Sequence, residues 1–454
     1  MKSKLNFTRN TLLFALFLLA QVVYSQENEA TTDTTIVFKK RVLEAIEVDF
    51  LTSYYKQDGV HSSVSGGIGS EKLTDLASNI VVAIPMNDDD VLTIDAGISA
   101  YTSASSSNIN PFDADAATPW QSSSGASEQD ALVALVVNYS HSSDDRNFIW
   151  NADVAVSMEY DYSSIGVGGG ITKLFNDKNS EISVKANVYL DNWQPIYPKE
   201  LQFGLNSVYD QSGTISSLYN PIFVEWDATN RNSYSASVTF SQVLTKKTQF
   251  SIFFDVVQQE GRLSSPYHRM YFADKANYYV GNPLGIPNYQ NESNTSTYHL
   301  ADAIEKLPES RFKLPIGVRW NYYVNEVFVI RTYYRYYTDN WDLTAHTASL
   351  EIPIKLSDKF TITPLYRYYT QTQSKYFAPY DTHLSTEEFY TSDYDLSTFD
   401  ANQYGFGFSY TDVFASGKLW KFGLKNIDLR FNHYDRSDGL SSTIGSVGFK
   451  FVMQ

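Results

Sequence analysis

The feature that most constrains the fold is an alternation of apolar and polar residues along the chain. Between positions 148 and 162 the odd positions include Asp153, Glu159 and Asp161, whereas the even positions read Phe148, Trp150, Ala152, Val154, Val156, Met158, Tyr160 and Tyr162. Successive side chains of a strand point to opposite faces, so this pattern predicts a strand with one apolar and one polar face. A length of about fifteen residues exceeds the roughly five or six of ordinary globular strands. Such strands are typical of barrels that cross a bilayer.

The aromatic content supports a membrane barrel, with 34 Tyr, 28 Phe and 7 Trp among 454 residues. Tyr and Trp favour the boundary between membrane and water. No apolar run of about 18 residues follows Val23, so we expect no further membrane helix. A membrane protein without such helices must be a closed barrel, because hydrocarbon cannot satisfy an open sheet edge. The competing interpretation is a series of soluble β-sandwich domains, whose strands are shorter.

The first 25 residues have the features of an export signal. A basic start precedes an apolar run over residues 12–23, and Val23-Tyr24-Ser25 provides an acceptable cleavage pattern. We therefore expect export through the Sec pathway and cleavage before Gln26. A short periplasmic segment over residues 26–41 and a transmembrane barrel over residues 42–454 would follow. The alternative is an uncleaved anchor.

Charge and cysteine usage exclude several classes of protein. The formal net charge is −16, and removing the signal, which holds three basic residues and no acid, leaves −19. This balance argues against nucleic acid as a partner. The chain has no Cys, so it has no disulfide framework, no lipidated Cys and no thiolate metal site.

We predict an all-β, antiparallel barrel of about sixteen strands, although 14 to 18 also fit the pattern. The predicted strands lie near residues 43–55, 73–85, 91–103, 131–141, 148–160, 165–175, 182–193, 234–244, 250–259, 312–324, 328–338, 343–356, 360–373, 403–413, 427–434 and 444–453. Short polar turns alternate with mostly longer loops. Bacterial barrels have short periplasmic turns and long outer loops, so this phase places both termini in the periplasm. Pro315, Pro353 and Pro364 interrupt predicted strands, and we expect them near periplasmic strand ends.

The last strand indicates how the barrel is assembled. Val447, Phe449, Phe451 and Met453 alternate with mostly small or polar residues. A terminal strand of this kind resembles the assembly signal of outer-membrane barrels, although the last residue is Gln454 rather than Phe. We therefore expect the outer membrane as location, with its lipids and the barrel-assembly machinery as partners.

The same alternation assigns residues to the lumen, because charges that face lipid are costly. The predicted inward acids are Glu159 and the site residues Asp153, Asp161, Asp191 and Asp255, and the predicted inward basic residues are Arg319, Arg331, Arg335, Arg367 and Arg430. We expect an acidic wall on the fifth to ninth strands to face a basic wall on the tenth to fifteenth. Opposed walls set up a transverse field, as in selective pores. The alternative is that these charges pair with one another and with Tyr hydroxyls as structural filling.

Several motifs resemble a known family. YRYYT occurs at 334–338 and again at 366–370, SPYHRMYF at 265–272 and TSDYDLS at 391–397. On these motifs the chain resembles a domain-of-unknown-function family of predicted outer-membrane β-barrels from Gram-negative bacteria. The family has no established activity, so the resemblance implies fold and location rather than mechanism. Its members are often encoded near flavin-transferring enzymes, which is an association and not an argument from the residues.

Two further sets of residues are candidates for cofactor or metal sites. Ser124-Gly125-Ala126-Ser127 looks like the core of a site where flavin mononucleotide is attached through phosphate, but Gln121 stands where the pattern has Asp. We expect no cofactor, with covalent flavin on Ser127 as the alternative. Metal sites need converging ligands. Nothing in the spacing makes the loop histidines and nearby aspartates converge, so we expect no metal at His268, His299, His346, His383, Asp274, Asp302, Asp339 or Asp381.

No phosphate loop, nucleophile elbow or paired-carboxylate motif occurs, so we expect no enzymatic activity. We interpret the chain as a porin-like channel or transporter for small solutes, because sixteen strands can leave an aqueous lumen. The alternative is a barrel plugged by the loop at 261–308 that serves as a binding or assembly partner for a periplasmic or surface protein. A flavin-linked redox system is one setting for that role.

Overall fold

A computed structural model describes residues 40–103, 129–194, 207–222, 229–291, 294 and 296–454. The predicted export signal, most of the predicted periplasmic segment and Ser127 lie outside the described residues. Within them the barrel strands are β1 (Glu47–Asp58), β2 (Leu73–Pro85), β3 (Asp90–Ser103), β4 (Gln129–Ser142), β5 (Phe148–Met158), β6 (Tyr162–Phe175), β7 (Ser180–Trp193), β9 (Thr229–Thr245), β10 (Thr248–Gly261), β15 (Ser310–Tyr323), β16 (Val329–Asp339), β17 (Thr344–Glu351) with β18 (Ile354–Lys355), β19 (Phe360–Gln371), β20 (Phe399–Thr411), β22 (Phe422–Arg436) and β23 (Ser441–Met453).

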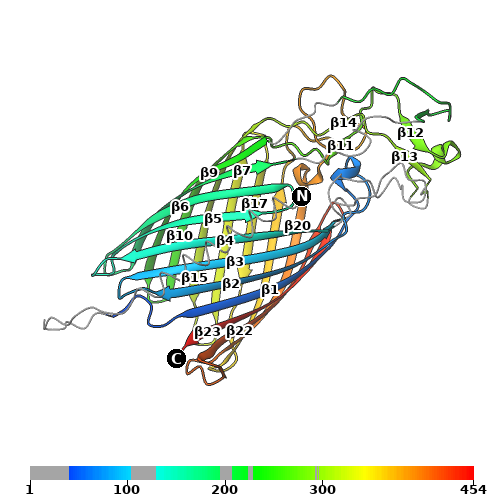
Figure 1. Cartoon of the computed structure of the whole chain (residues 1–454). Coiled ribbons are helices and arrows are strands. Elements are labelled where there is room, and N and C mark those ends of the chain that lie inside the picture. Colours follow the sequence, from blue (N-terminus) through cyan, green and yellow to red (C-terminus); the bar gives the residue numbers. More distant parts are fainter. Residues whose placement is uncertain (1–39, 104–128, 195–206, 223–228, 292–293, 295) are drawn as a thin grey trace. The chain divides into compact units, whose positions relative to one another are not determined.

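These strands form one closed antiparallel barrel of sixteen strands (Figure 1), as predicted. Each strand pairs with the next in chain order, and β1 closes the ring by pairing with β23 from Glu47↔Val452 to Asp58↔Ser441. We count β17 and β18 as one strand, and the short β21 (Lys418–Leu419) belongs to a turn. Closure leaves no strand edge unpaired, which is the condition for a sheet in hydrocarbon.

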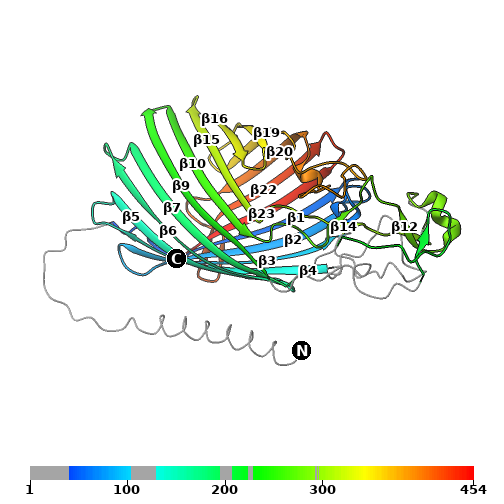
Figure 2. The same ribbon diagram turned by 90° about the horizontal axis from the view of Figure 1, so that it is seen from above.

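The long loops all lie at one end of the barrel, as predicted, although three connections at that end, 159–161, 340–343 and 437–440, are short. The opposite end carries turns without such loops, and the C-terminus lies there, because Gln454 N–H donates to Lys421 O. The other end carries the long loops, which include β11 (Arg269–Met270), β12 (Tyr278–Gly281), β13 (Thr297–His299) and β14 (Ala303–Ile304). Figures 1 and 2 show these loop strands at the end remote from the C-terminus.

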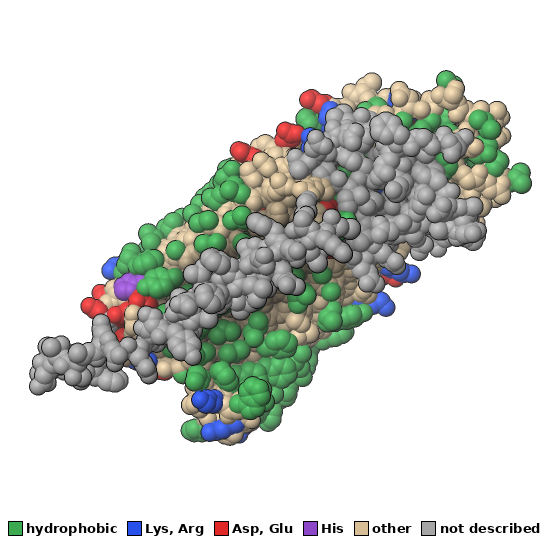
Figure 3. All heavy atoms as spheres, in the orientation of Figure 1, with side chains coloured by type: hydrophobic (Ala, Val, Ile, Leu, Met, Phe, Trp, Pro, Cys, Tyr) green, Lys and Arg blue, Asp and Glu red, His purple; other side chains and the backbone are tan. Residues whose placement is uncertain are grey.

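Apolar side chains cover the outside of the barrel. On β5 every even-numbered residue from Phe148 to Met158 is exposed, whereas the odd-numbered residues are half-buried or buried. Figure 3 shows hydrophobic side chains gathered over the visible flank of the strands. The alternation therefore places the apolar face toward lipid and the polar face toward the lumen, as predicted. Among the described residues, no helix is both long enough and apolar enough to cross a membrane.

The three prolines within predicted strands interrupt strand pairing, but Pro315 lies at a different end of its strand from the one predicted. Pro353 separates β17 from β18, and pairing with β19 is interrupted there and opposite Pro364. Pairing between β10 and β15 is likewise interrupted at Pro315, because proline lacks the N–H that the ladder needs. The expectation that all three lie near the short-turn end was wrong for Pro315, which lies near the long-loop end of β15.

A packed set of loops covers the long-loop end, and we call it the cap. The cap comprises the described residues among 59–72, 207–222, 262–309, 340–343 and 372–398. Three buried hydrophobic clusters hold it together, centred on Trp341 with Phe377, on Tyr298 with Leu300, and on Met270 with Phe272. The buried hydrophobic clusters of this protein therefore lie largely in loops, while the barrel interior is lined by polar side chains.

Candidate functional site: a charged lumen beneath the cap

The basic side of the lumen contains three of the predicted arginines. Arg319 on β15, Arg331 on β16 and Arg367 on β19 line a cavity of about 580 Å³. The Arg319 guanidinium lies 5.6 Å from the ring centre of Tyr333 and 5.8 Å from that of Phe253. Rings at these distances hold the guanidinium extended over the lumen through cation–π attraction.

These arginines have few acidic partners. Arg331 Nη1 lies 3.9 Å from Glu351 Oε2, at the limit of an ion pair. Of the residues that the structure describes, none places a carboxylate within 4.0 Å of the guanidinium of Arg319, Arg335, Arg367 or Arg430. The basic side therefore keeps positive charge that neighbouring acids do not neutralise by contact.

The carboxylates of the acidic side differ in their hydrogen bonding. Ser164 Oγ donates to the buried Asp191 Oδ1 at 2.6 Å. Asp153 pairs across the strands with Gly168, where a Cβ would lie 2.6 Å from Asp153 Oδ2, so glycine makes room for the carboxylate. Among the described residues Asp153 Oδ1 has no hydrogen-bond partner, so Asp191 is held by a hydroxyl and Asp153 is not.

Strand order sets which charged strands lie across the lumen from one another. In a ring of sixteen, β19 and β22 lie eight strands from β5 and β7, so Arg367 and Arg430 are half a turn from Asp153 and Asp191. The same count sets β15 and β16 opposite β2 and β3, which carry Asp75 and Asp95.

Asp75 and Asp95 also lie in the inward phase, although neither was among the predicted lumenal acids. Ser99 Oγ donates to Asp75 Oδ1 and Asn79 Nδ2 to Asp95 Oδ1, each at 2.6 Å. Leu76, next to Asp75, and Ile98, three residues after Asp95, point outward and are exposed. Extending the alternation to these two strands would have found both acids.

Two predicted acids do not belong to an opposed wall. Asp161 was placed on the fifth strand, but β5 ends at Met158 and Asp161 lies in the turn before β6, which closes through Glu159 N–H donating to Tyr162 O. There it accepts hydrogen bonds from Tyr267 Oη at 2.5 Å and Trp193 Nε1 at 3.2 Å. Asp255 lies on β10, beside the strand of Arg319 rather than across from it.

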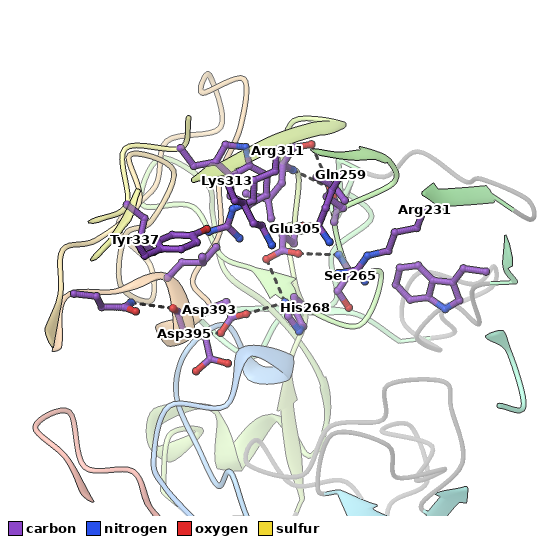
Figure 4. Close-up of a pocket in the computed structure, with 18 of the residues that line it drawn as sticks. Arg231, Gln259, Ser265, His268, Glu305, Arg311, Lys313, Tyr337, Asp393 and Asp395 are labelled. Carbon is purple, nitrogen blue, oxygen red and sulfur yellow. Dashed lines mark hydrogen bonds and ion pairs between the residues drawn. The ribbon is translucent and has the colours of Figure 1, made fainter. Parts of the chain in front are cut away.

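Two further cavities lie where the cap meets the barrel. One of about 590 Å³ is lined by wall residues, including Arg231, Arg335 and Lys313, and by loop residues (Figure 4). The second, of about 520 Å³, is lined by Gln57 and Arg436 among others. Both cavities share His268, Asp393 and Asp395, which therefore form a polar partition between them.

The partition brings together three groups that could hold a metal ion. Ligand atoms of His268, Glu305 and Asp393 all lie within 4.8 Å of one another. His268 Nδ1 lies 3.2 Å from Glu305 Oε1. Thr391 Oγ1 and Ser265 N–H also donate to the Glu305 carboxylate, at 2.6 Å and 2.7 Å. Of the loop histidines singled out in the sequence, His268 converges with acids, but its partners are not the aspartates considered with it.

Burial and mutual attraction set the charges of this cluster. Burial disfavours the charged ring of His268, but attraction and a hydrogen bond from Glu305, with further attraction from Asp393, raise its pKa to about 9. Burial opposes ionisation of Glu305 too, yet the contact with His268 holds the Glu305 pKa below its ordinary value. Burial raises the pKa of Asp393 to about 6, against the attraction of His268. The cluster is therefore an ion pair with a second carboxyl beside it.

The other loop histidines do not join this cluster. His383 contacts Glu387, with 2.6 Å between Nδ1 and Oε2. His299 Nδ1 lies 2.8 Å from Tyr380 Oη, and burial lowers the His299 pKa to about 3. His346 contacts Tyr334 on β16, outside the cap. These three histidines therefore act in packing and local hydrogen bonding.

The family of the chain follows from its sequence. A family model described as "Protein of unknown function (DUF3570)" matches residues 12–447. The chain belongs to this family. The match spans nearly every barrel strand and confirms the resemblance noted from the motifs, and the family description names no activity. No curated protein matches the chain.

Solved outer-membrane proteins have a weak likeness to this structure. A "bacterial polysaccharide outer membrane secretin" has a TM-score of 0.42 at 10% identity, over 90% of this chain and 99% of its own. OccK2 (OpdF) of Pseudomonas aeruginosa, in complex with glucuronate, scores 0.39 at 7% identity, over 90% and 96%. A FadL homologue of Pseudomonas aeruginosa scores 0.37 at 10% identity, over 90% of each chain. These values assign no function, and the strand pairing itself establishes the barrel.

Proposed function

We propose that this protein is an outer-membrane channel for small solutes, with a preference for anions. The observation that carries the proposal is the set of lumenal arginines without a contacting carboxylate. Arg319 and Arg367 line the cavity of about 580 Å³ inside the barrel, and Arg335 lines the cavity of about 590 Å³. Unpaired positive charge in a narrow lumen attracts anions and raises their local concentration.

Reversal potentials across planar bilayers test the proposal. The purified protein should conduct, and in a salt gradient its reversal potential should have the sign of anion selectivity. Replacing Arg319 and Arg367 by Gln should move that potential toward zero, because two lumenal charges are lost. Arg41→Gln is the matched control, since Arg41 lies at the short-turn end in a surface pair with Asp88. Cation selectivity, or an unchanged potential in the double variant, would contradict the proposal.

The second candidate is a plugged barrel that binds a protein partner. The observation that favours it is the cap, whose residues Ser264, His268 and Leu396 line the same cavity as wall residues. A protein of this kind would show no conductance and no liposome swelling, and would co-purify with a lipoprotein or a redox protein. A stable conductance without any bound partner supports the channel instead.

The proposal extends to export and location. We propose that the Sec pathway exports the chain, that cleavage precedes Gln26, and that the barrel-assembly machinery inserts it among outer-membrane lipids. In this setting the short turns face the periplasm and the cap faces outward. N-terminal sequencing of protein from the outer-membrane fraction should begin at Gln26. Recovery in the soluble fraction would overturn this part.

A further inference from the structure

Residues from three places in the cap meet at one point of the partition. His268 follows β10 in the chain, Glu305 precedes β15, and Asp393 belongs to the loop before β20. His268 Nδ1 lies 3.2 Å from Glu305 Oε1 and 4.0 Å from Asp393 Oδ2. Figure 4 shows the three side chains pointing toward one another.

Hydrogen bonds from neighbouring residues orient two of these groups, Glu305 and Asp393. Ser265 N–H and Thr391 Oγ1 donate to Glu305, which is buried. Asp395 N–H donates to Asp393 Oδ1 at 3.0 Å, which leaves Oδ2 directed toward the histidine. Hydrogen bonds of this kind orient the ligands of protein metal sites. Hydrogen bonds therefore orient the carboxylates of this cluster, which distinguishes it from a group of acids on the surface.

The spacing suits a small divalent ion. Ligands bound tetrahedrally to Zn²⁺ at its usual bond lengths lie about 3.4 Å apart. The two measured separations, 3.2 Å and 4.0 Å, fall on either side of that value. One imidazole with two carboxylates is a donor set that first-row transition metals accept, whereas Ca²⁺ and Mg²⁺ prefer oxygen alone.

We propose that His268, Glu305 and Asp393 bind one first-row divalent metal ion, for which Zn²⁺ is the representative. The histidine nitrogen that now contacts Glu305 would carry the ion in place of its hydrogen. His268 and Asp393 line the cavities on both sides of the partition, so a remaining coordination position is accessible to water. The ion would tie residues 262–309 to residues 372–398. This site does not depend on whether the barrel conducts.

Titration calorimetry with ZnCl₂ on the chelator-treated full chain in detergent tests the site. We expect one equivalent of Zn²⁺, confirmed by elemental analysis after desalting. His268→Gln and Asp393→Asn should each weaken binding by about tenfold or more. Glu387→Gln is the matched control, because Glu387 also contacts a cap histidine, His383, and should bind as the wild type does.

The outcomes separate a lost site from a lost fold. Asp393 is only half-buried, so Asp393→Asn removes a ligand without emptying a packed position. Retained heat-modifiable migration on gels and unchanged near-ultraviolet circular dichroism would show that each variant is folded. Absence of stoichiometric Zn²⁺ binding in the wild type overturns the proposal. Equal affinity in all three variants overturns it as well.

Discussion

Arg436, the last residue of β22, forms an ion pair with Asp395 of the cap, with 2.6 Å between Nη1 and Oδ1. Arg436 Nη2 also donates to Tyr394 O at 2.9 Å, and the guanidinium lies 3.8 Å from the ring centre of Phe399. One buried side chain of the wall thus holds the loop that supplies Asp393. The cap is fastened to the barrel through contacts of this kind.

Arg436→Gln should release residues 372–398. The substitution removes the contact with Asp395 and leaves Asp438, another partner of Arg436, buried without its counter-charge. Breaking such a pair costs about 3 kcal/mol or more, so the local unfolding free energy of the loop should fall by that order. Amide hydrogen exchange of residues 372–398 measures it. Arg41→Gln, which removes an exposed pair, should leave exchange in the cap unchanged.

Shortening the loop over residues 262–308 should raise conductance several-fold. Gly261 N–H donates to Glu309 O at 2.9 Å, so the ends of β10 and β15 already meet, and a short Gly-Ser turn can join them. The deletion removes His268 and Glu305 from the partition and widens the path beneath the cap. Single-channel current of the refolded variant is the measurement. A current equal to that of the wild type would show that this loop does not restrict the lumen.

His299 should destabilise the cap as the pH falls below about 6.5, whereas His268, whose pKa is raised to about 9, contributes in the opposite sense. Burial lowers the pKa of His299 to about 3, so at pH 5 the opened loop binds a proton at His299 that the packed loop does not. A basic group whose pKa is lower in the folded form therefore destabilises that form as the pH falls from the pKa of the unfolded form toward the pKa of the folded form. The loss from His299 is about 2 kcal/mol at pH 5 relative to pH 7.5.

Proteolysis of the cap at several pH values measures this effect. His299→Asn, which cannot be protonated, should shift the change in cap stability between pH 7.5 and pH 5 by about 2 kcal/mol in favour of the packed form, relative to the wild type. It should also lower stability at pH 7.5, because packing against Tyr271 and Tyr279 is lost. His141→Asn at the short-turn end should keep the pH dependence of the wild type. The same pH dependence in His299→Asn and in the wild type would contradict this role of His299.

The turn before β22 should insert into the lipid interface. Phe414 is 85% exposed and Trp420 is 93% exposed, and Lys418 and Lys421 flank the tryptophan. Exposed aromatic residues beside lysines favour the boundary between headgroups and acyl chains. In proteoliposomes that contain lipid brominated close to the headgroup, bromine should quench the fluorescence of Trp420. Trp420→Phe should therefore reduce the fraction of tryptophan fluorescence that the brominated lipid quenches. Trp341→Phe should not, because Trp341 is buried in the cap.

The barrel follows closely from local pattern. The strand predicted over residues 73–85 is β2 at its observed bounds, and the strand predicted from Phe148 starts where β5 does. A barrel strand has water on one side and lipid on the other, so the polarity of each residue indicates which side its side chain faces. The same local pattern caused the wrong placement of Asp161 on the fifth strand. The alternation of polar and apolar residues continues through the turn at 159–161, although the hydrogen-bonded pairing of β5 with β6 does not.

Local pattern along the chain predicts the strands, their order, the inward arginines and the end at which the long loops lie, while closure of the ring settles the number of strands at sixteen. Each of these predicted features depends on a local period of two or on the length of a connection, and both are readable along the chain. The tertiary structure alone decided that His268, Glu305 and Asp393 meet, because loops have no period that relates residues so far apart in the chain. It also decided which acids face which arginines, since that depends on the closure of β1 onto β23.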